Sequence, residues 1–341
     1  MSTQSPQQLT IAVDAMGGDH GPPTAVPAVL EVLAEQPDVK FILVGREAIV
    51  APMWSQQGRP FADRLYIHHA SEVVEMGERP QDALRKKKDS SMRVALDLVK
   101  AGQATACVSA GNTGALMATA RFVLKTIPGI DRPAILSRIP AHHGHTHMLD
   151  LGANADCSPE NLLQFAVMGS VVAADLHGAL QPRIGLLNIG SEDIKGNELV
   201  QEAARLLQRS TLNYIGFVEG NDIFSGEVDV VVTDGFTGNV ALKTMEGLAR
   251  MLGATIKNEY TRTPLRRLSA LASMPVLKSL QKRFDPGRHN GASMVGLNNV
   301  VIKSHGGADA ASFANAIRVA IVEARKGVPL QVSQLLQEQV Q

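Results

Sequence analysis

Short apolar segments alternate with longer segments of helical character along nearly the whole chain, and this alternation restricts the fold. The segments with strand character are residues 9–15, 40–45, 65–70, 104–109, 134–138, 148–151, 183–188, 214–218, 228–233 and 300–303. The segments with helix character are residues 25–34, 80–101, 161–176, 196–208 and 310–325, with further stretches from 113 to 125 and beyond 239. This order predicts an α/β protein of three layers, in which helices cover both faces of a mixed, mostly parallel sheet.

The composition fits one large globular unit and limits its function. No clean linker divides the 341 residues, so we predict a single domain over residues 1–341, either undivided or with two lobes. Lys plus Arg equals Asp plus Glu, at 33 each, and aromatic residues are scarce at 4%, which argues against a nucleic-acid partner. Only two cysteines and a polar N-terminus without signal-peptide layout favour the cytoplasm. No apolar run approaches the length of a membrane span.

Two loops with similar sequences each follow an apolar segment and precede a predicted helix. Unpaired backbone N–H groups and the positive end of the helix dipole make such a turn suitable for an anion. Glycines allow close backbone approach, and Asn, Ser and Thr side chains supply donors. The candidate substrate-binding residues are Ser109, Gly111, Asn112, Thr113 and Gly114 in the first loop and Asp234, Thr237, Gly238 and Asn239 in the second. A structural alternative stays open, since Asn112, Thr113 or Asn239 could cap a helix.

Further glycine-rich strand ends carry polar residues of the same kind. The first predicted strand leads into Asp14, Gly17, Gly18 and His20, and the last leads into His305. Both histidines are candidate acid–base groups or anion donors, although a lone histidine is more often structural. Lys195 comes just before a predicted helix, where the dipole disfavours a cation unless an anion binds there too. Lys195 is therefore a candidate phosphate ligand.

Several familiar signatures of nucleotide and ester chemistry are missing from the chain. There is no G-x-x-x-x-G-K-[ST], no G-x-S-x-G and no G-x-G-x-x-G after the first predicted strand. The four histidines at positions 142, 143, 145 and 147 have only Asp150 nearby to complete a metal site, so an exposed hairpin tip is favoured. Cys107 lies in an apolar strand and is expected to be buried. These features indicate that phosphate is handled as a substrate and not as part of a cofactor.

Residues 257–284 depart from the alternating pattern, because they are basic and amphipathic with Glu259 as the single acid. They predict a protruding helical hairpin of two pieces, interrupted by Pro264 and Pro275, around an apolar tip near residues 268–277. This element is buried in a subunit interface, docked on an anionic membrane surface, or used for both. Its candidate contact residues are Arg266, Arg267, Leu268, Leu271, Met274 and Leu277. A second basic run, residues 85–88, is either a solvated helix face or a docking surface for an acidic partner.

Taken in order, these motifs resemble those of the bacterial PlsX family of phosphate acyltransferases in phospholipid synthesis. The matching segments are residues 13–19, 87–92, 109–115, 150–154, 188–190, 195–196, 234–239 and 305–309. The resemblance covers nearly the whole chain. It implies a fold like the isocitrate and isopropylmalate dehydrogenases and the phosphotransacetylases, a homodimer, and peripheral attachment to the cytoplasmic membrane. No metal or organic cofactor is implied.

The implied reaction converts long-chain acyl-[acyl carrier protein] and inorganic phosphate into acyl phosphate and free carrier protein, close to a downstream glycerol-3-phosphate acyltransferase. A thiol leaving group has a pKa of about 8.5, so a strong general acid is unnecessary. The site must instead hold phosphate beside the carbonyl and stabilise an oxyanion. We assign phosphate positioning to Lys195 and oxyanion or phosphate donation to Asn239.

Two rival functions remain open at this stage. A coenzyme A-dependent phosphotransacetylase would use the same kind of site with a different carrier pocket. A membrane-associated dimeric scaffold without activity would explain residues 257–284 but not the donor-rich loops. A metal-dependent decarboxylating dehydrogenase is disfavoured, because the clustered aspartates and arginines that it needs are not found.

Overall fold

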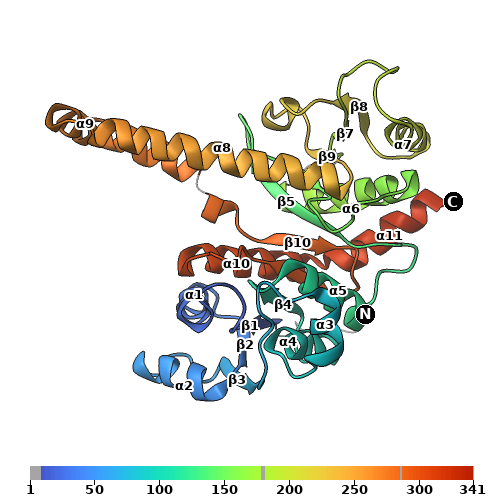
Figure 1. Ribbon diagram of the computed structural model, residues 1–341. Helices are drawn as coiled ribbons and strands as arrows, with labels where there is room; N and C mark the ends of the chain where they lie inside the picture. The colour runs from blue at the N-terminus through green and yellow to red at the C-terminus, as the bar shows by residue number, and fades with distance from the viewer. Residues whose placement is uncertain (1–8, 178–180, 285, 341) are drawn as a thin grey trace.

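A single sheet of eleven strands runs through the molecule, and the loops at its strand ends build the site (Figure 1). The computed structural model describes residues 9–177, 181–284 and 286–340. The strand order is β3-β2-β1-β4-β11-β10-β5-β6-β9-β7-β8. The strands are β1 (Leu9–Asp14), β2 (Val39–Gly45), β3 (Leu65–His69), β4 (Ala106–Ser109), β5 (Ala134–Pro140), β6 (His145–Leu149), β7 (Ile184–Leu187), β8 (Tyr214–Val218), β9 (Val230–Val232), β10 (Ala292–Val295) and β11 (Val300–Lys303).

The strand directions confirm a mixed, mostly parallel sheet. β3, β2, β1, β4 and β11 run parallel to one another. β10 is antiparallel to both β11 and β5, and β5 forms an antiparallel hairpin with β6. β6, β9, β7 and β8 are again mutually parallel. The β6–β8 half therefore runs in the opposite direction to the β1–β4 half.

Helices cover both faces of the sheet, which confirms the predicted three layers. The helices are α1 (Pro22–Glu35), α2 (Glu47–Gln56), α3 (Pro80–Lys86), α4 (Ser91–Lys100), α5 (Thr113–Leu124), α6 (Pro159–His177), α7 (Glu198–Arg209), α8 (Gly235–Thr261), α9 (Pro264–Phe284), α10 (Ala310–Lys326) and α11 (Val328–Val340). On one face, α1 and α10 bury the first half of the sheet, and α6, α7 and α11 bury the second. On the other face, α4 and α5 cover the first half, and α8 lies over β5, β6 and β9.

The single helix predicted over residues 80–101 is wrong, because the chain forms α3 and α4 with a break between them. Ser90 begins α4, and its Oγ accepts a hydrogen bond from Arg93 N at 3.4 Å. Lys87 ends α3 and turns its Nζ towards Glu78 Oε2, at 2.7 Å. The basic run at 85–88 therefore does not form one helix face. The sequence patterns also do not predict α2, α11 and β10.

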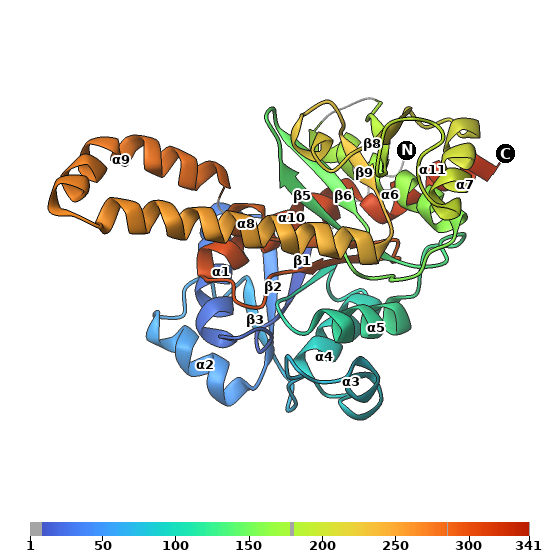
Figure 2. The same cartoon turned by 45° about the horizontal axis from the view of Figure 1, so that its top comes forward.

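The predicted protruding hairpin is present, but its tip is not apolar. Figures 1 and 2 show α8 and α9 running antiparallel and extending away from the sheet. The turn lies at Arg262 and Thr263, between the end of α8 and Pro264. Pro275 is inside α9 and does not interrupt it. The leucines expected at the tip lie instead along the length of α9. In the described part of the chain, we find no helix that is both long and apolar enough to cross a membrane.

Candidate active site

The ends of three parallel strands bring Asp14, Ser109 and Lys303 into one row. Lys303 is in register with Ser109, and the neighbouring pair Val13 and Val108 places Asp14 beside Ser109. Residues in register lie on the same face of a sheet. The Ser109 hydroxyl donates to Asp14 Oδ2 at 2.6 Å, and Gly111 N donates to Ser109 Oγ at 3.0 Å. The row is buried and opens directly into the glycine-rich loops.

These loops touch one another so closely that only glycine fits at two positions. A Cβ on Gly17 would lie 2.7 Å from Gly111 N, and a Cβ on Gly18 would lie 2.9 Å from Gly306 O. Gly18 also has a φ of 87°, which disfavours other residues. Asp19 N donates to Gly306 O at 2.9 Å. The predicted site residues after β1 and β4 are thus brought together with the loop that contains His305.

Asp14 anchors this arrangement from within. Burial raises the pKa of its carboxyl group, while hydrogen bonds from the Ser109 side chain and from the backbone of Met16 and Gly17 act in the opposite direction. The two backbone donors reach Oδ1 at 3.2 and 3.1 Å. Asp14 therefore shapes the first glycine loop and does not face solvent.

Lys303 is a site residue that the sequence patterns do not predict. It is 8% exposed, and its Nζ donates to Ala110 O at 3.2 Å and to Ser304 O. Burial lowers the pKa of its amine to about 8, and the charges of Asp14 and Asp19 oppose that effect. The residue ties the loop after β4 to the loop after β11. A lysine that ends an otherwise apolar strand, just before a glycine-rich loop, is the signal that could have revealed it.

A second cluster forms where α8 begins. Asp234 caps this helix, since its Oδ1 accepts from Thr237 N at 2.8 Å and its Oδ2 from the Thr237 hydroxyl at 2.7 Å. The interpretation of Asn239 as the helix cap is wrong, because α8 begins four residues earlier. Asn239 is exposed and lies against Gly152, where a Cβ would be 3.3 Å from Asn239 Cγ. Its amide is thus available to a substrate.

Buried Asp150 organises the backbone beneath Asn239. Its carboxylate accepts from Ile135 N at 2.9 Å, Ala153 N at 3.0 Å and Asn154 N at 2.7 Å. Burial raises its pKa, and these hydrogen bonds act against that. A Cβ on Gly238 would lie only 1.9 Å from Asp150 O, so α8 crosses this loop in direct backbone contact.

Asn112 caps α5, which is the structural alternative to a direct role in substrate binding. Its Oδ1 accepts from Ala115 N at 2.9 Å at the start of α5, and its Nδ2 donates to Met76 O at 2.6 Å and Glu78 O at 3.1 Å. Thr113 and Gly114 are exposed in the first turn of that helix. The side chain of Asn112 therefore fixes the loop, while its neighbours face outward.

α8 connects the two clusters. Ala241, Leu242 and Met245 pack on the same face of the sheet as Ala292 of β10, which is in register with Lys303. Lys243 is close enough to Lys303 for its charge to lower the pKa of that amine further. Lys243 also pairs with Glu246 at 2.9 Å. One surface thus receives groups from both halves of the sheet.

Lys195, His20 and His305 are exposed. Lys195 lies in the loop between β7 and α7, where its carbonyl accepts from Asn188 Nδ2 at 3.1 Å. With about 4.8 Å per strand, β7 lies roughly 24 Å from β11 along the sheet. His305 Nδ1 accepts from Gly307 N at 3.1 Å. The geometry brings Lys195 into neither cluster by direct contact, and its role stays a prediction.

No activated protein nucleophile lies among the cysteines and the serine of the site. Cys107 is fully buried, as expected, and burial raises its pKa strongly. Burial also raises the pKa of Cys157, to about 11. The Ser109 hydroxyl is buried and donates a hydrogen bond to Asp14 Oδ2. A reactive thiolate or alkoxide at these positions would be costly.

The fold is that of the phosphotransacylases. The solved EutD phosphotransacetylase from Staphylococcus aureus superposes with a TM-score of 0.59 at 18% identity, over 94% of each chain. A phosphotransacetylase from Streptococcus pyogenes superposes with a TM-score of 0.60, also at 18% identity and over 94% of each chain. Together with a site rich in anion donors, this architecture defines an α/β protein with an anion-binding site at its strand ends.

Sequence comparison identifies the family within that class. The chain belongs to the fatty acid synthesis protein family, whose model matches residues 9–331. A relative from Methylococcus capsulatus named phosphate acyltransferase is 58% identical over 95% of this chain and 96% of its own. A phosphate acyltransferase from Nitrosococcus oceani is 59% identical over the same shares. The expected family and enzyme class, a phosphate acyltransferase, are confirmed.

Proposed function

We propose that this phosphate acyltransferase forms long-chain acyl phosphate from acyl-[acyl carrier protein] and inorganic phosphate, for phospholipid synthesis. One observation carries the proposal. Glycine-rich loops after β1, β4 and β11 meet around Lys303, and α8 brings Lys243 and the exposed Asn239 to the same face of the sheet. Backbone donors beside two cations suit a phosphate dianion, and the nearby amide suits a developing oxyanion.

In this mechanism a phosphate oxygen attacks the thioester carbonyl directly. A bond forms between the phosphate oxygen and the carbonyl carbon as the carbonyl oxygen becomes an oxyanion, and collapse of this intermediate breaks the C–S bond and expels the carrier thiolate. The thiolate is a good leaving group, because the pKa of a thiol is about 8.5. After it leaves, the thiolate takes up a proton from solvent. Holding the two reactants in contact supplies much of the rate enhancement. The inert environments of Cys107, Cys157 and Ser109 favour this direct route.

Lys195 and Asn239 are the residues to which we assign phosphate positioning and oxyanion donation. Because Lys195 lies in an exposed loop beyond β7, it would have to approach the phosphate when substrate binds. Lys195→Ala and Asn239→Ala are expected to reduce kcat about 100-fold, the usual effect of losing one oxyanion or phosphate donor. Near-normal turnover in both variants would remove them from the mechanism.

The α8–α9 hairpin, defined as residues 235–284, supports a proposal of homodimerisation and peripheral membrane contact. Leu265, Leu268 and Leu271 are 75%, 64% and 65% exposed. Arg266 and Arg267 lie between them in the sequence, so apolar and basic groups share one element. Such a combination is typical of a surface that binds anionic lipid or a second subunit. The same proposal places the protein in the cytoplasm at the membrane surface, in contact with the downstream glycerol-3-phosphate acyltransferase.

The proposed substrate is tested by trapping. The enzyme is incubated with phosphate and either palmitoyl-acyl carrier protein or palmitoyl-coenzyme A, and acyl phosphate is trapped with hydroxylamine as the hydroxamate. We expect hydroxamate from the carrier-protein thioester, dependent on phosphate. A clear preference for the coenzyme A thioester would indicate a phosphotransacetylase-type enzyme, and no hydroxamate from either would favour the scaffold function.

A further inference from the structure

The outer face of α5 forms a continuous stripe that begins at the substrate loop. Thr113, Met117 and Arg121 follow one another at intervals of four residues, and Ala118 and Phe122 run beside them. Residues at this spacing lie on one side of a helix. The opposite side of α5 is buried, whereas along the stripe Arg121 and Phe122 are exposed. Met117 and Ala118 are half-buried, and Met117 also packs against the core. From Thr113 to Lys125 the stripe spans about 18 Å at 1.5 Å per residue.

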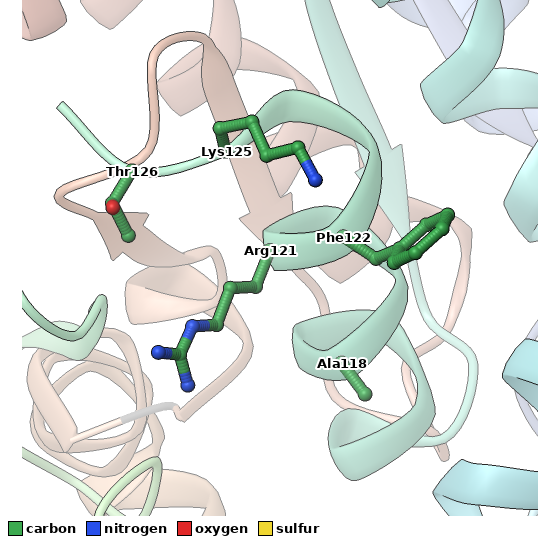
Figure 3. Close-up of a pocket in the computed structure, with 5 residues that line it drawn as sticks. All are labelled: Ala118, Arg121, Phe122, Lys125 and Thr126. Carbon is green, nitrogen blue, oxygen red and sulfur yellow. The ribbon is translucent and has the colours of Figure 1, made fainter.

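The far end of the stripe is hollowed and basic. A surface cavity of about 340 Å³ is lined by Ala118, Arg121, Phe122, Lys125 and Thr126 (Figure 3). Arg121 and Phe122 leave the helix in different directions, and Phe122 is 54% exposed. Lys125 Nζ lies 4.9 Å from the centre of the Phe122 ring, and the Arg93 guanidinium carbon lies 5.4 Å from it. We call Arg93, Arg121, Phe122 and Lys125 the basic aromatic surface.

This surface carries an excess of positive charge. Arg93 pairs with Asp97 at 2.9 Å, and Arg121 donates to the backbone oxygen of Asp131 at 3.3 Å. The Asp131 carboxylate accepts from Asn161 and Gln164 instead. Lys125 is exposed and sits over an aromatic face. Two of the three cations therefore have no carboxylate in a salt bridge among the described residues, which favours an acidic ligand.

Lys125 occupies a backbone conformation that glycine would adopt more easily. Its φ is 64° and its ψ 169°, in a region that is nearly restricted to glycine. Asn298 holds the segment, since its Nδ2 donates to Leu124 O at 3.0 Å and Thr126 O at 3.1 Å. Its backbone N also donates to Lys125 O at 3.2 Å. A side chain at a strained position is most simply explained by a use for that side chain.

We propose that the basic aromatic surface docks the acidic carrier protein that delivers the acyl thioester, and that the stripe along α5 guides its extended thiol arm to the substrate loop. The inference rests on the proposed function and adds to it the place where the carrier binds. Negative charges on the carrier would face Arg121 and Lys125, and an apolar side chain would fill the hollow beside Phe122. Met117 and Ala118 supply an uncharged path towards Thr113.

Charge reversal tests the docking surface. For Arg121→Glu/Lys125→Glu, we expect the KM for acyl-[acyl carrier protein] to rise about ten-fold with kcat within two-fold of wild type. The rise should shrink as salt is added. The matched control is Arg205→Glu/Arg209→Glu on exposed α7, with the same change in charge, and it should leave KM unchanged. An unchanged KM in the α5 variant, or an equal rise in the control, would overturn the proposal.

Lys125→Gly separates docking from stability. Removing a strained side chain should leave the thermal midpoint equal or higher, while the KM for the carrier-protein thioester still rises. An unaltered KM would overturn the role of Lys125.

Dissociation of an oligomer by the double charge reversal, measured by light scattering, would assign the surface to a second copy of this chain. If the wild-type enzyme gives no hydroxamate from the carrier-protein thioester, the proposed function itself is wrong. If the wild type is active and the variants have an unchanged KM, only the proposed docking surface is wrong.

Discussion

At the scale of single residues, Gly238 is the most constrained position of the site. A Cβ there would lie 1.9 Å from Asp150 O, whereas a Cβ on Gly247 of the same helix meets nothing within 4 Å. We expect Gly238→Ala to lower the free energy of unfolding by about 1–3 kcal/mol, because backbone must move. Gly247→Ala should raise it by about 1 kcal/mol, since alanine favours helix. Urea titration of both variants checks this, and equal effects would contradict the close crossing of α8 over Asp150.

Lys303 should make phosphate binding depend on pH. Its pKa is lowered to about 8 by burial, so its positive charge is present below pH 8 and is lost as the pH rises through that value. The KM for phosphate should therefore rise above pH 8. Lys303→Met should show a KM about ten-fold higher at pH 7 and no inflection near pH 8. Steady-state kinetics between pH 6.5 and 9.5 test this prediction. If the inflection near pH 8 persists in the Lys303→Met variant, it belongs to the titration of phosphate or of another group, and not to Lys303.

The sequence alone indicates those site residues whose types are unusual at the end of an apolar strand. Asp14, Ser109 and Gly111 were identified because polar and glycine residues at the ends of apolar strands are informative on their own. Local sequence does not mark Lys303 or Lys243 as a site residue, because both look like surface lysines. Lys303 ends a strand, and Lys243 lies inside a helix with a polar face. Their approach to each other depends on how α8 crosses the sheet, which no local pattern contains.

At the scale of elements, the α8–α9 hairpin offers a sharp test of membrane contact. Leu277 was a candidate contact, but it is only partly exposed in α9, whereas Leu268 and Leu271 are 64% and 65% exposed. Leu268→Glu/Leu271→Glu should abolish co-sedimentation with vesicles of anionic phospholipid while leaving the fold intact. Leu330→Glu on α11, at a leucine that is also 65% exposed, is the control and should still sediment.

Undiminished vesicle binding by the double variant would assign the apolar face of α9 to a subunit interface instead. A fall in oligomeric state without loss of vesicle binding would point the same way. Either result leaves the acyltransferase chemistry of the chain untouched, because both substituted leucines lie on α9, which extends away from the sheet (Figure 2).

Element prediction succeeded where hydrophobic periodicity was strong and failed where local chemistry overrode it. The strands around residues 39–45 and 300–303 were placed nearly to the residue, because each is a short run of buried apolar side chains. Periodicity predicts one helix over 80–101, because it does not show that Ser90 caps α4 or that Lys87 turns inward after α3. A proline usually interrupts a helix, yet Pro275 lies inside α9.

At the scale of the whole molecule, the place of β10 in the sheet could not be predicted, because its four residues Ala292–Val295 carry too weak a pattern to identify. β10 is antiparallel to both of its neighbours, so β5 runs in the same direction as β11. The β5–β6 hairpin then inverts the second half of the sheet. We propose that the chain is a single domain, supported by the continuous sheet. Coincident unfolding of both halves, followed by hydrogen exchange, is the expected result.

The central claim is that phosphate itself attacks the thioester, without an acyl-enzyme intermediate. It is tested most directly by mixing the enzyme at substrate concentration with acyl-[acyl carrier protein] in the complete absence of phosphate, and measuring free thiol and protein mass. The account predicts no burst of thiol and no acyl adduct on the enzyme, with stoichiometric thiol release only after phosphate is added. A phosphate-independent burst of thiol together with an acylated residue, at Cys157, Ser109 or elsewhere, would contradict it.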